Sequence, residues 1–121
     1  MIYLASPYTH TDPAVQQQRF EEAARAAAML LREGRLVFSP IVHGHPIASH
    51  GEFPGNWEAW EAMALWHIKR CDKLVVLKLP GWSESRGIKA EVDIAARYHK
   101  PVELWDWPQP LLHIAGAGGS Y

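Results

Sequence analysis

Four short apolar runs, separated by segments of helical periodicity, constrain the fold of this chain more than any other feature. Each run is brief and bounded by glycine, proline or polar residues, which is typical of buried strands. Three longer segments repeat apolar residues at the spacing of an amphipathic helix. The runs are Ile2–Ala5, Leu36–Phe38, Lys73–Leu79 and Pro101–Trp105, and the helical segments are Ala14–Glu33, Trp57–Arg70 and Ser85–His99.

This alternation favours an α/β fold in which a parallel sheet is covered by helices on both faces. We expect about four to five strands in a Rossmann- or flavodoxin-like arrangement, because crossovers between parallel strands are right-handed. A chain of 121 residues suits one such domain. We assign residues 1–107 to that domain, and we expect the glycine-rich tail, residues 108–121, to be mobile at its end.

The loops at one edge of the expected sheet are the place to look for a ligand. In parallel sheets, ligands bind beyond the carboxyl ends of the strands. Three loops emerge at that edge, at residues 3–8, 39–45 and 79–85. Residues 41–56 show no sustained period, so we expect a functional loop or short turns there.

Charge and cysteine content narrow the partners and the compartment. The net charge is −1 with histidine neutral, which gives no reason to expect a nucleic-acid polymer or an anionic membrane as partner. The single cysteine, Cys71, excludes an internal disulfide and fits a reducing compartment, so we expect a cytoplasmic protein. We expect no signal peptide and no membrane span, because no apolar run has the necessary length or flanks.

Six tryptophans and seven histidines are many for a chain of this length. Such rings suit a pocket for a flat ligand, although tryptophans equally fill cores and interfaces. We expect Trp82, which lies between the third strand and the third helix, to be the ring that stacks on a ligand. The tryptophans expected in the core or at a subunit contact are Trp57, Trp60 and Trp66.

The segment Gly81–Glu91 leads from the third strand into the third helix, and its residues are the best suited of the chain to ligand binding and catalysis. A helix that starts here leaves backbone N–H groups free, where the helix dipole also favours an anion. Ser85 is placed to cap the helix, a role compatible with a phosphate contact, and Arg86 follows it. Glu91 lies among apolar neighbours, so its carboxylate either faces solvent or is kept for chemistry.

Several motifs in series give the chain a family resemblance. They are Ile2-Tyr3-Leu4-Ala5-Ser6-Pro7-Tyr8, Val37-Phe38-Ser39-Pro40-Ile41, Cys71-Asp72-Lys73-Leu74-Val75-Val76-Leu77, and Pro80-Gly81-Trp82-Ser83-Glu84-Ser85-Arg86-Gly87 with Glu91. From Met1 to about Val102 the chain resembles the DUF1937 family. That family is similar to the nucleoside 2-deoxyribosyltransferase superfamily, which includes the 2′-deoxynucleoside 5′-monophosphate N-glycosidases, and the resemblance implies their fold.

The resemblance also implies a reaction and roles for single residues. Glu91 matches the catalytic glutamate that attacks the anomeric carbon and forms a covalent glycosyl-enzyme, and Tyr3 matches the tyrosine that orients this glutamate. Ser85 matches a serine that contacts the 5′-phosphate. We therefore expect cleavage or transfer of the N-glycosidic bond of a small nucleotide in a homo-oligomer, with no cofactor and no metal. The other substrate-binding candidates are Ser6, Pro7, Tyr8, Ser39, His43, Trp82, Arg86 and Gly87.

One position departs from the superfamily pattern. The second helix usually carries an aspartate that serves as acid/base for the leaving nucleobase, and Ala64 stands at that position here. Glu61 and His67 lie three residues away on either side, and we take His67 as the catalytic acid/base candidate. The missing aspartate keeps two alternatives open. One is a nucleotide-binding or sensing module, and the other is a hydrolase of another N-glycoside such as a nicotinamide nucleotide.

Three histidines invite a metal interpretation. His43 and His45 alternate, as two ligands on one side of an extended segment do, with His50 and Glu52 close in sequence. A loop that borders a ligand pocket explains these histidines equally well, and no tighter ligand spacing supports a metal site.

Overall fold

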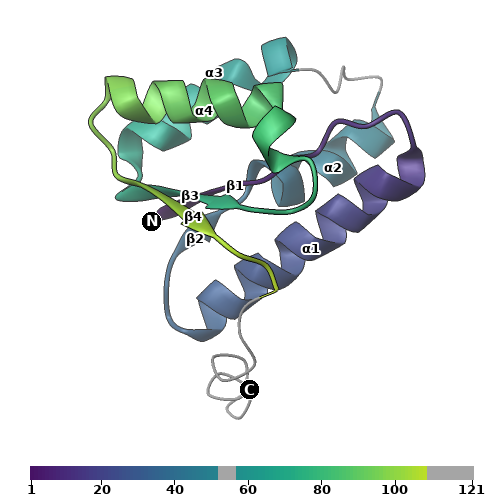
Figure 1. Ribbon diagram of the computed structural model, residues 1–121, viewed down its shortest axis with the longest axis horizontal. Coiled ribbons are helices and arrows are strands. Elements are labelled where there is room, and N and C mark those ends of the chain that lie inside the picture. Colours follow the sequence, from purple (N-terminus) through teal and green to yellow (C-terminus); the bar gives the residue numbers. More distant parts are fainter. Residues whose placement is uncertain (52–56, 109–121) are drawn as a thin grey trace.

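The sheet of this computed structural model, which describes residues 1–51 and 57–108, is parallel. Its strands are β1 (Ile2–Ala5), β2 (Val37–Phe38), β3 (Lys73–Leu77) and β4 (Val102–Trp105). They lie in the order β2-β1-β3-β4, so β1 and β3 are each paired on both sides (Figure 1). The expected α/β fold with a parallel sheet is confirmed.

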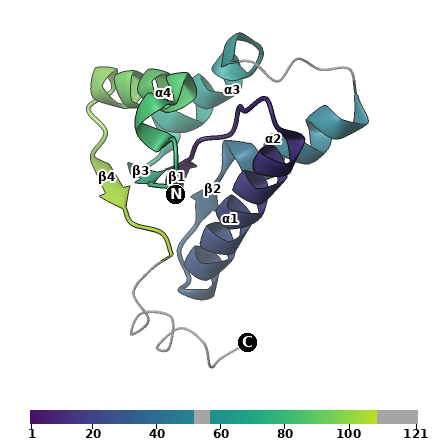
Figure 2. The same cartoon turned by 45° about the vertical axis from the view of Figure 1, so that its right-hand side comes forward.

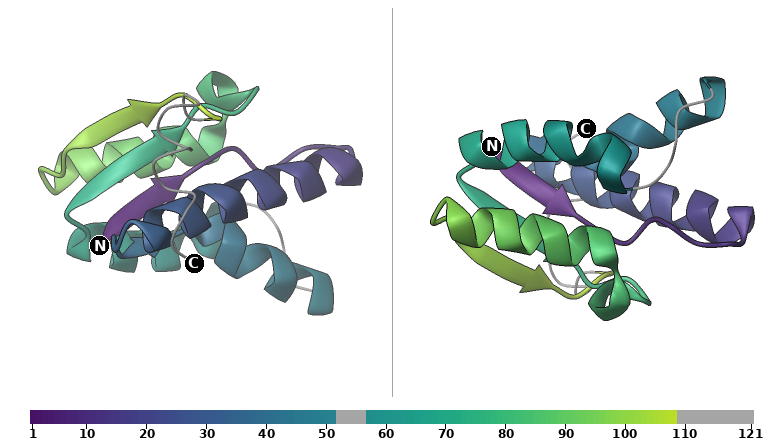
Figure 3. Two further views of the ribbon diagram at one scale, coloured as in Figure 1. Left: turned by 90° about the horizontal axis from the view of Figure 1, so that it is seen from below. Right: turned by 90° about the horizontal axis from the view of Figure 1, so that it is seen from above.

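Helices cover both faces of this sheet. They are α1 (Pro13–Arg32), α2 (Pro40–His50), α3 (Trp57–Arg70) and α4 (Arg86–Arg97), with a 3₁₀ turn η1 (Trp82–Glu84) before α4. Helix α1 lies on one face, and α3 and α4 pack side by side on the other (Figure 3). Helix α2 packs against α1 and lies beyond the carboxyl ends of the strands (Figure 2).

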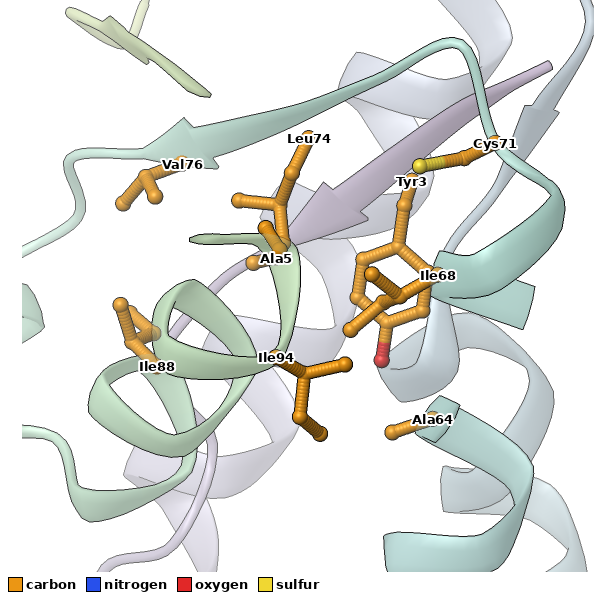
Figure 4. Close-up of a cluster of buried hydrophobic side chains, with 10 residues drawn as sticks. Tyr3, Ala5, Ala64, Ile68, Cys71, Leu74, Val76, Ile88 and Ile94 are labelled. Carbon is orange, nitrogen blue, oxygen red and sulfur yellow. The ribbon is translucent and has the colours of Figure 1, made fainter. Parts of the chain in front are cut away.

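The alternation of side chains along β1 divides the core into two clusters. Ile2 and Leu4 point to the α1 face, whereas Tyr3 and Ala5 point to the face covered by α3 and α4. Full burial of one large apolar side chain contributes about 1.5–3 kcal/mol, so both layers of helices are held by the sheet. Figure 4 shows the second cluster, which also contains Ala64, Ile68, Cys71, Leu74, Val76, Ile88 and Ile94.

Polar caps fix where the helices begin and end. Asp12 Oδ1 accepts a hydrogen bond from the backbone N–H of Ala14 at 2.9 Å, as the sequence indicates for the start of α1. Gly34, with a φ of 79°, follows the end of this helix, where a left-handed residue satisfies the last carbonyl groups. The caps of α2 and α4 are Ser39 and Ser85.

The prediction of an irregular connection at residues 41–56 is wrong for its first part, which forms α2. Ser39 Oγ accepts a hydrogen bond from the backbone N–H of Val42 at 3.1 Å and starts the helix. The apolar period of α2 is weak because one side packs on α1 and another faces a pocket, and Pro46 inside the helix obscures the pattern further. Residues 52–56 lie outside the described residues.

Within residues 1–51 and 57–108, no helix is both long enough and apolar enough to cross a bilayer. The tail expected at the end of the chain falls outside these ranges from residue 109 onward.

Candidate functional site

A pocket of about 560 Å³ opens at the carboxyl edge of the sheet, and the segments that follow β1 and β3 both contribute to its lining. The chain passes from β1 to β2 on one side, and β3 then pairs with β1 on the other. Such a switch in strand order is where open α/β sheets bind ligands. Seven of the predicted site residues line the pocket: Tyr3, Ser6, Tyr8, Ser85, Arg86, Gly87 and Glu91.

A buried carboxyl group is the most distinctive feature of this pocket. Glu91 is only 5% exposed, and α4 directs it toward the sheet rather than toward solvent. Tyr3, which is fully buried in β1, donates a hydrogen bond from its hydroxyl to Glu91 Oε2 at 2.5 Å. In Figure 4 the Tyr3 hydroxyl points away from the sheet, into the space between α3 and α4. The two residues predicted to work together therefore meet.

The surroundings of Glu91 change its acidity. Burial raises the pKa of Glu91 to about 8, and the hydrogen bond from Tyr3 opposes this rise. The cause is desolvation, which disfavours the charged form of a carboxyl group. Burial and the neighbouring Glu91 raise the pKa of Tyr3 well above its usual value, so Tyr3 keeps the proton that it donates. A carboxyl group that titrates near neutrality is suited to acid/base or nucleophilic chemistry.

Ser6 presents a buried hydroxyl to the pocket. It is 5% exposed, and its Oγ has no hydrogen-bond partner within the described residues. A buried polar atom left without a partner costs about 1–3 kcal/mol, and such atoms are rare in folded proteins. Because Ser6 lines the pocket, its hydroxyl is a candidate for a polar contact with a ligand.

The start of α4 forms a second polar region. Ser85 Oγ accepts a hydrogen bond from the backbone N–H of Ile88 at 3.2 Å, which leaves the hydroxyl proton for another acceptor. Arg86 Nη2 lies 3.6 Å from Glu58 Oε1 of α3, and both side chains are exposed at the pocket rim. A serine, an arginine and the first N–H groups of a helix together suit an anion.

Arg19 of α1 joins two loops at the mouth of the pocket. Its Nη1 donates to the carbonyl oxygen of Thr9 at 3.0 Å, and its Nη2 donates to that of Pro80 at 3.1 Å. Gly81 follows with a φ of 90°, and a Cβ on Gly81 would lie 2.7 Å from Arg19 Nη2. Sequence patterns do not single out Arg19, because it is one of several charged residues on an amphipathic helix.

Tyr8 and His45 form a further wall of the pocket, built from the loop after β1 and from α2. The Tyr8 oxygen lies 2.6 Å from His45 Nδ1, and His45 Nε2 lies 3.0 Å from Gln17 Oε1 of α1. Phe20 stacks on the His45 ring with the centroids 4.3 Å apart. The ring of His45 is thus fixed by contacts to α1 and to the loop after β1. This group was hidden in the sequence because it depends on the helical conformation of α2.

Trp57 packs against a core cluster, as predicted, whereas Trp60 and Trp82 are placed differently from the expectation. Trp57 and Trp60 line the pocket from α3, and the ring of Trp60 lies 3.4 Å from the position of a Cβ built on Gly44 in α2. Trp82 is absent from the pocket lining and instead borders a separate shallow groove with Leu104 of β4. The first half of α3 reaches over the pocket, which the sequence spacing does not reveal.

The predicted acid/base residue lies outside the pocket. Ala64, at the position where the superfamily pattern has an aspartate, lines the pocket and brings no acid to it. The His67 ring stacks on Phe38 of β2 with the centroids 3.6 Å apart, and its Nδ1 lies 2.8 Å from the carbonyl oxygen of Met63. The rotation of α3 between Ala64 and His67 therefore turns the imidazole toward β2, contrary to the role predicted for it.

Three further candidates also lie outside the pocket lining. Pro7 is buried, and Ser39 is buried as the cap of α2. His43 is exposed, and its ring lies 5.7 Å from that of Phe38, measured between centroids. The structure gives these residues packing and capping contacts rather than places in the pocket.

The helical conformation of α2 also removes the basis of the metal interpretation. Alternate residues of an α-helix point about 200° apart, so His43 and His45 do not share one side. His50 Nδ1 lies 2.9 Å from the carbonyl oxygen of Pro46. Over the described ranges, no group of three or more His, Cys, Asp or Glu side chains is placed to hold a metal ion, and Glu52 lies outside those ranges.

Comparison with known families now adds to this geometry. The sequence model of DUF1937, a domain of unknown function, matches residues 1–107. The chain belongs to the DUF1937 family. Every pocket residue named above lies within the matched region. No curated protein matches the chain in a sequence search.

Proposed function

We propose that this DUF1937 domain is a nucleoside 2-deoxyribosyltransferase-like enzyme that cleaves or transfers the N-glycosidic bond of a (deoxy)nucleoside 5′-monophosphate. The observation that carries the proposal is the buried Glu91 carboxyl group, which accepts a hydrogen bond from Tyr3 in the pocket wall. The resemblance of the sequence to that superfamily suggests the reaction, and Glu91, Tyr3 and Ser85 bring a nucleophile, the hydroxyl that orients it and a phosphate contact to one pocket.

In the proposed reaction, Glu91 acts in its ionised form. One carboxylate oxygen attacks C1′ of the sugar while the bond from C1′ to the base breaks, and the electron pair of that bond leaves with the base. Tyr3 holds the other oxygen and fixes the direction of attack. The positive charge that develops on the sugar favours the carboxylate form of Glu91, which offsets the effect of burial on its pKa. Water or a second base then takes the sugar from Glu91.

The start of α4 supports a phosphorylated substrate. Ser85 and Arg86 lie with the free N–H groups of the helix at the same pocket, and an anion there gains from the helix dipole. The volume of about 560 Å³ is within the range of pockets that bind small organic ligands. Trp57 and Trp60 offer aromatic surface for the nucleobase.

The test is incubation with a panel of nucleoside and deoxynucleoside 5′-monophosphates, followed by chromatography for the free base. We expect base release with at least one member and its loss in Glu91→Gln. Asp93→Asn is the matched control, because Asp93 is an exposed carboxylate on the same helix and does not line the pocket. Base release that persists unchanged in Glu91→Gln contradicts the proposal.

The presence of Ala64 in the pocket favours a second candidate, a nucleotide-binding or sensing module without turnover. The same panel separates the two functions when calorimetry is run beside the chromatography. A binding module holds nucleotides about equally well in the wild type and in Glu91→Gln, and neither protein sets any base free. A panel that includes a nicotinamide nucleotide also tests the third alternative, because free nicotinamide then appears in place of a nucleobase.

A further inference from the structure

Departure of a nucleobase needs a proton donor, and Ala64 provides none. Most titratable side chains of the pocket lining are engaged with other groups or lie at its exposed rim. Tyr3 and Glu91 are bonded to each other, and Glu58 lies beside Arg86 at the exposed rim. Glu84 is exposed and accepts a hydrogen bond from Ser83 at 2.8 Å. Among the described residues that line the pocket, the remaining acid/base groups are Tyr8 and His45.

The hydrogen bonds around His45 fix its tautomer. The amide nitrogen of Gln17 faces Glu21 Oε1 at 3.4 Å, so the amide oxygen of Gln17 faces His45. This oxygen lies 3.0 Å from His45 Nε2, which therefore carries a proton and donates it to Gln17. In neutral His45 the other nitrogen, Nδ1, is then an acceptor, and the Tyr8 hydroxyl donates to it at 2.6 Å.

Gln17, His45 and Tyr8 form a series of hydrogen bonds that ends at the pocket. Both nitrogens of His45 are engaged, one by Gln17 and one by Tyr8. Within this series of hydrogen-bonded side chains, the Tyr8 oxygen is therefore the atom that can contact a ligand. Burial raises the pKa of Tyr8, which keeps its hydroxyl protonated around neutral pH. Protonation of His45 at Nδ1 reverses its hydrogen bond with Tyr8 and frees the Tyr8 proton for the pocket.

We propose that Tyr8 is the catalytic acid for the leaving base and that His45 supplies it with a proton, with Gln17 as the positioning residue. The inference rests on the proposed N-glycosidase or transferase function. As Glu91 bonds to C1′ and the bond from C1′ to the base breaks, the departing base takes the hydroxyl proton of Tyr8. Tyr8 takes the Nδ1 proton of His45, and His45 becomes neutral. In the second half-reaction the proton moves in the opposite direction. Tyr8 takes a proton from the water or base that attacks C1′ and passes its own proton back to His45.

This arrangement uses different elements from the aspartate of the superfamily pattern. Tyr8 comes from the loop after β1, His45 from α2 and Gln17 from α1, whereas Ala64 belongs to α3. Phe20 and Tyr8 pack against the His45 ring, the first stacked and the second edge-on, so the ring cannot rotate freely. Tyr8, the proposed acid, thus lies on a different wall of the pocket from Ala64.

The experiment compares two kinds of substrate in Tyr8→Phe and His45→Gln. One is the nucleoside monophosphate that the wild-type protein cleaves best, and the other is p-nitrophenyl 2-deoxyriboside 5-phosphate, whose nitrophenolate leaves without a proton. General acid catalysis contributes about 100-fold to 10,000-fold. We therefore expect both variants to lose about 100-fold or more in base release, while the first-turnover burst of nitrophenolate changes by less than about threefold. His50→Gln, an exposed histidine of α2 outside the pocket lining, is the control and is expected to match the wild type on both substrates.

The outcomes separate this inference from the function on which it rests. Equal losses on both substrates, or no loss on either, overturn the roles of Tyr8 and His45 while the proposed function stands. A wild-type protein that releases nitrophenolate but no base from any nucleotide also overturns them. If the wild type releases neither, or if Glu91→Gln retains full nitrophenolate release, the proposed function itself is overturned. Circular dichroism of each variant shows that it is folded. The two variants remove different members of the proton-transfer series, Tyr8 in one and His45 in the other.

Discussion

Tyr3 in the central strand β1 donates a hydrogen bond to Glu91 of α4, although 88 positions separate the two residues in the chain. The contact lies in the pocket wall and joins the sheet to α4, the helix whose first residues are proposed to contact a phosphate. Because burial raises the pKa of Glu91 and Tyr3 lowers it, the two residues together set the pH at which the carboxylate forms.

The pH dependence of the proposed reaction follows from this pair. Only the carboxylate form of Glu91 attacks the sugar. With the p-nitrophenyl substrate, whose leaving group needs no proton from Tyr8 and His45, we therefore expect kcat/KM to rise with pH through a midpoint near 8, the pKa that burial gives Glu91 in the free protein. Tyr3→Phe removes the hydrogen bond that lowers this pKa, so the midpoint is expected to move to higher pH. Initial rates across a series of buffers at constant ionic strength give the midpoint for the wild type and for Tyr3→Phe. A midpoint that moves to lower pH in Tyr3→Phe contradicts this account.

The same shift in pKa affects folding stability. Glu91 has a pKa of about 8 when folded, against 4.5 as the ordinary value, so between these limits the folded protein holds a proton that the unfolded chain has lost. The contribution of this group to stability is therefore present at low pH and is lost as the pH rises through 8. Glutamine imitates the neutral acid, so Glu91→Gln is expected to be more stable than the wild type at pH 9.

Thermal unfolding at two pH values measures this effect. One pKa unit corresponds to about 1.4 kcal/mol, and about 1 kcal/mol moves Tm by about 4 °C in a small domain. We expect Glu91→Gln to gain at least about 4 °C over the wild type at pH 9 and much less at pH 5. A gap that is the same at both pH values shows that Glu91 does not titrate in this range. Asp93→Asn, which changes an exposed carboxylate of the same helix, is expected to show no such gain.

Ser85 offers a test of phosphate recognition that spares the fold. Aspartate is as good a helix cap as serine, so Ser85→Asp keeps the hydrogen bond to the Ile88 N–H but places a negative charge beside the anion site. We expect Ser85→Asp to weaken binding of a nucleoside monophosphate about tenfold or more and to leave binding of the nucleoside nearly unchanged. Isothermal calorimetry with both ligands checks this. Equal weakening of both ligands argues against a phosphate at Ser85.

Gly81 and Arg19 are expected to be coupled in stability. Alanine at position 81 must adopt a φ of 90°, which costs about 1–2 kcal/mol, and its Cβ would lie 2.7 Å from Arg19 Nη2. Gly81→Ala is therefore expected to lower the free energy of unfolding in two ways, through the strained backbone at position 81 and through displacement of Arg19 from the carbonyl groups of Thr9 and Pro80. In an Arg19→Met background the same substitution is expected to cost less. Urea unfolding of the four proteins gives the coupling energy, and strictly additive losses contradict the contact.

The fold could be predicted from the sequence because its signals are local. The four apolar runs became the four strands of the sheet in the structure, and Asp12 and Gly34 mark the ends of α1. Helix α2 could not be predicted, since Pro46 lies inside it and its two sides face a helix and a pocket rather than a core and solvent. Its start was nevertheless readable in Ser39, which is a good cap.

The site was predictable only in part. Glu91, Tyr3 and Ser85 belong to one series of motifs, and all three line the pocket. His67 was misplaced because three residues along α3 suffice to turn a ring away from the pocket toward β2. Arg19, His45 and Trp60 could not be predicted because each meets the pocket only through the packing of helices that are distant in sequence.

The position of β1 in the sheet has a consequence for the way a ligand enters. Tyr3 lies on a strand paired on both sides, so displacing it requires opening of the whole sheet, a motion with nearly the free energy of global unfolding. His45 lies on α2, whose main neighbour is α1, so local opening of that wall disturbs far less of the structure. We expect amide hydrogens of β1 to exchange orders of magnitude more slowly than those of α2. We therefore expect the half of the pocket that holds Glu91 to keep its shape, and a ligand to enter by local opening of the half formed by α2.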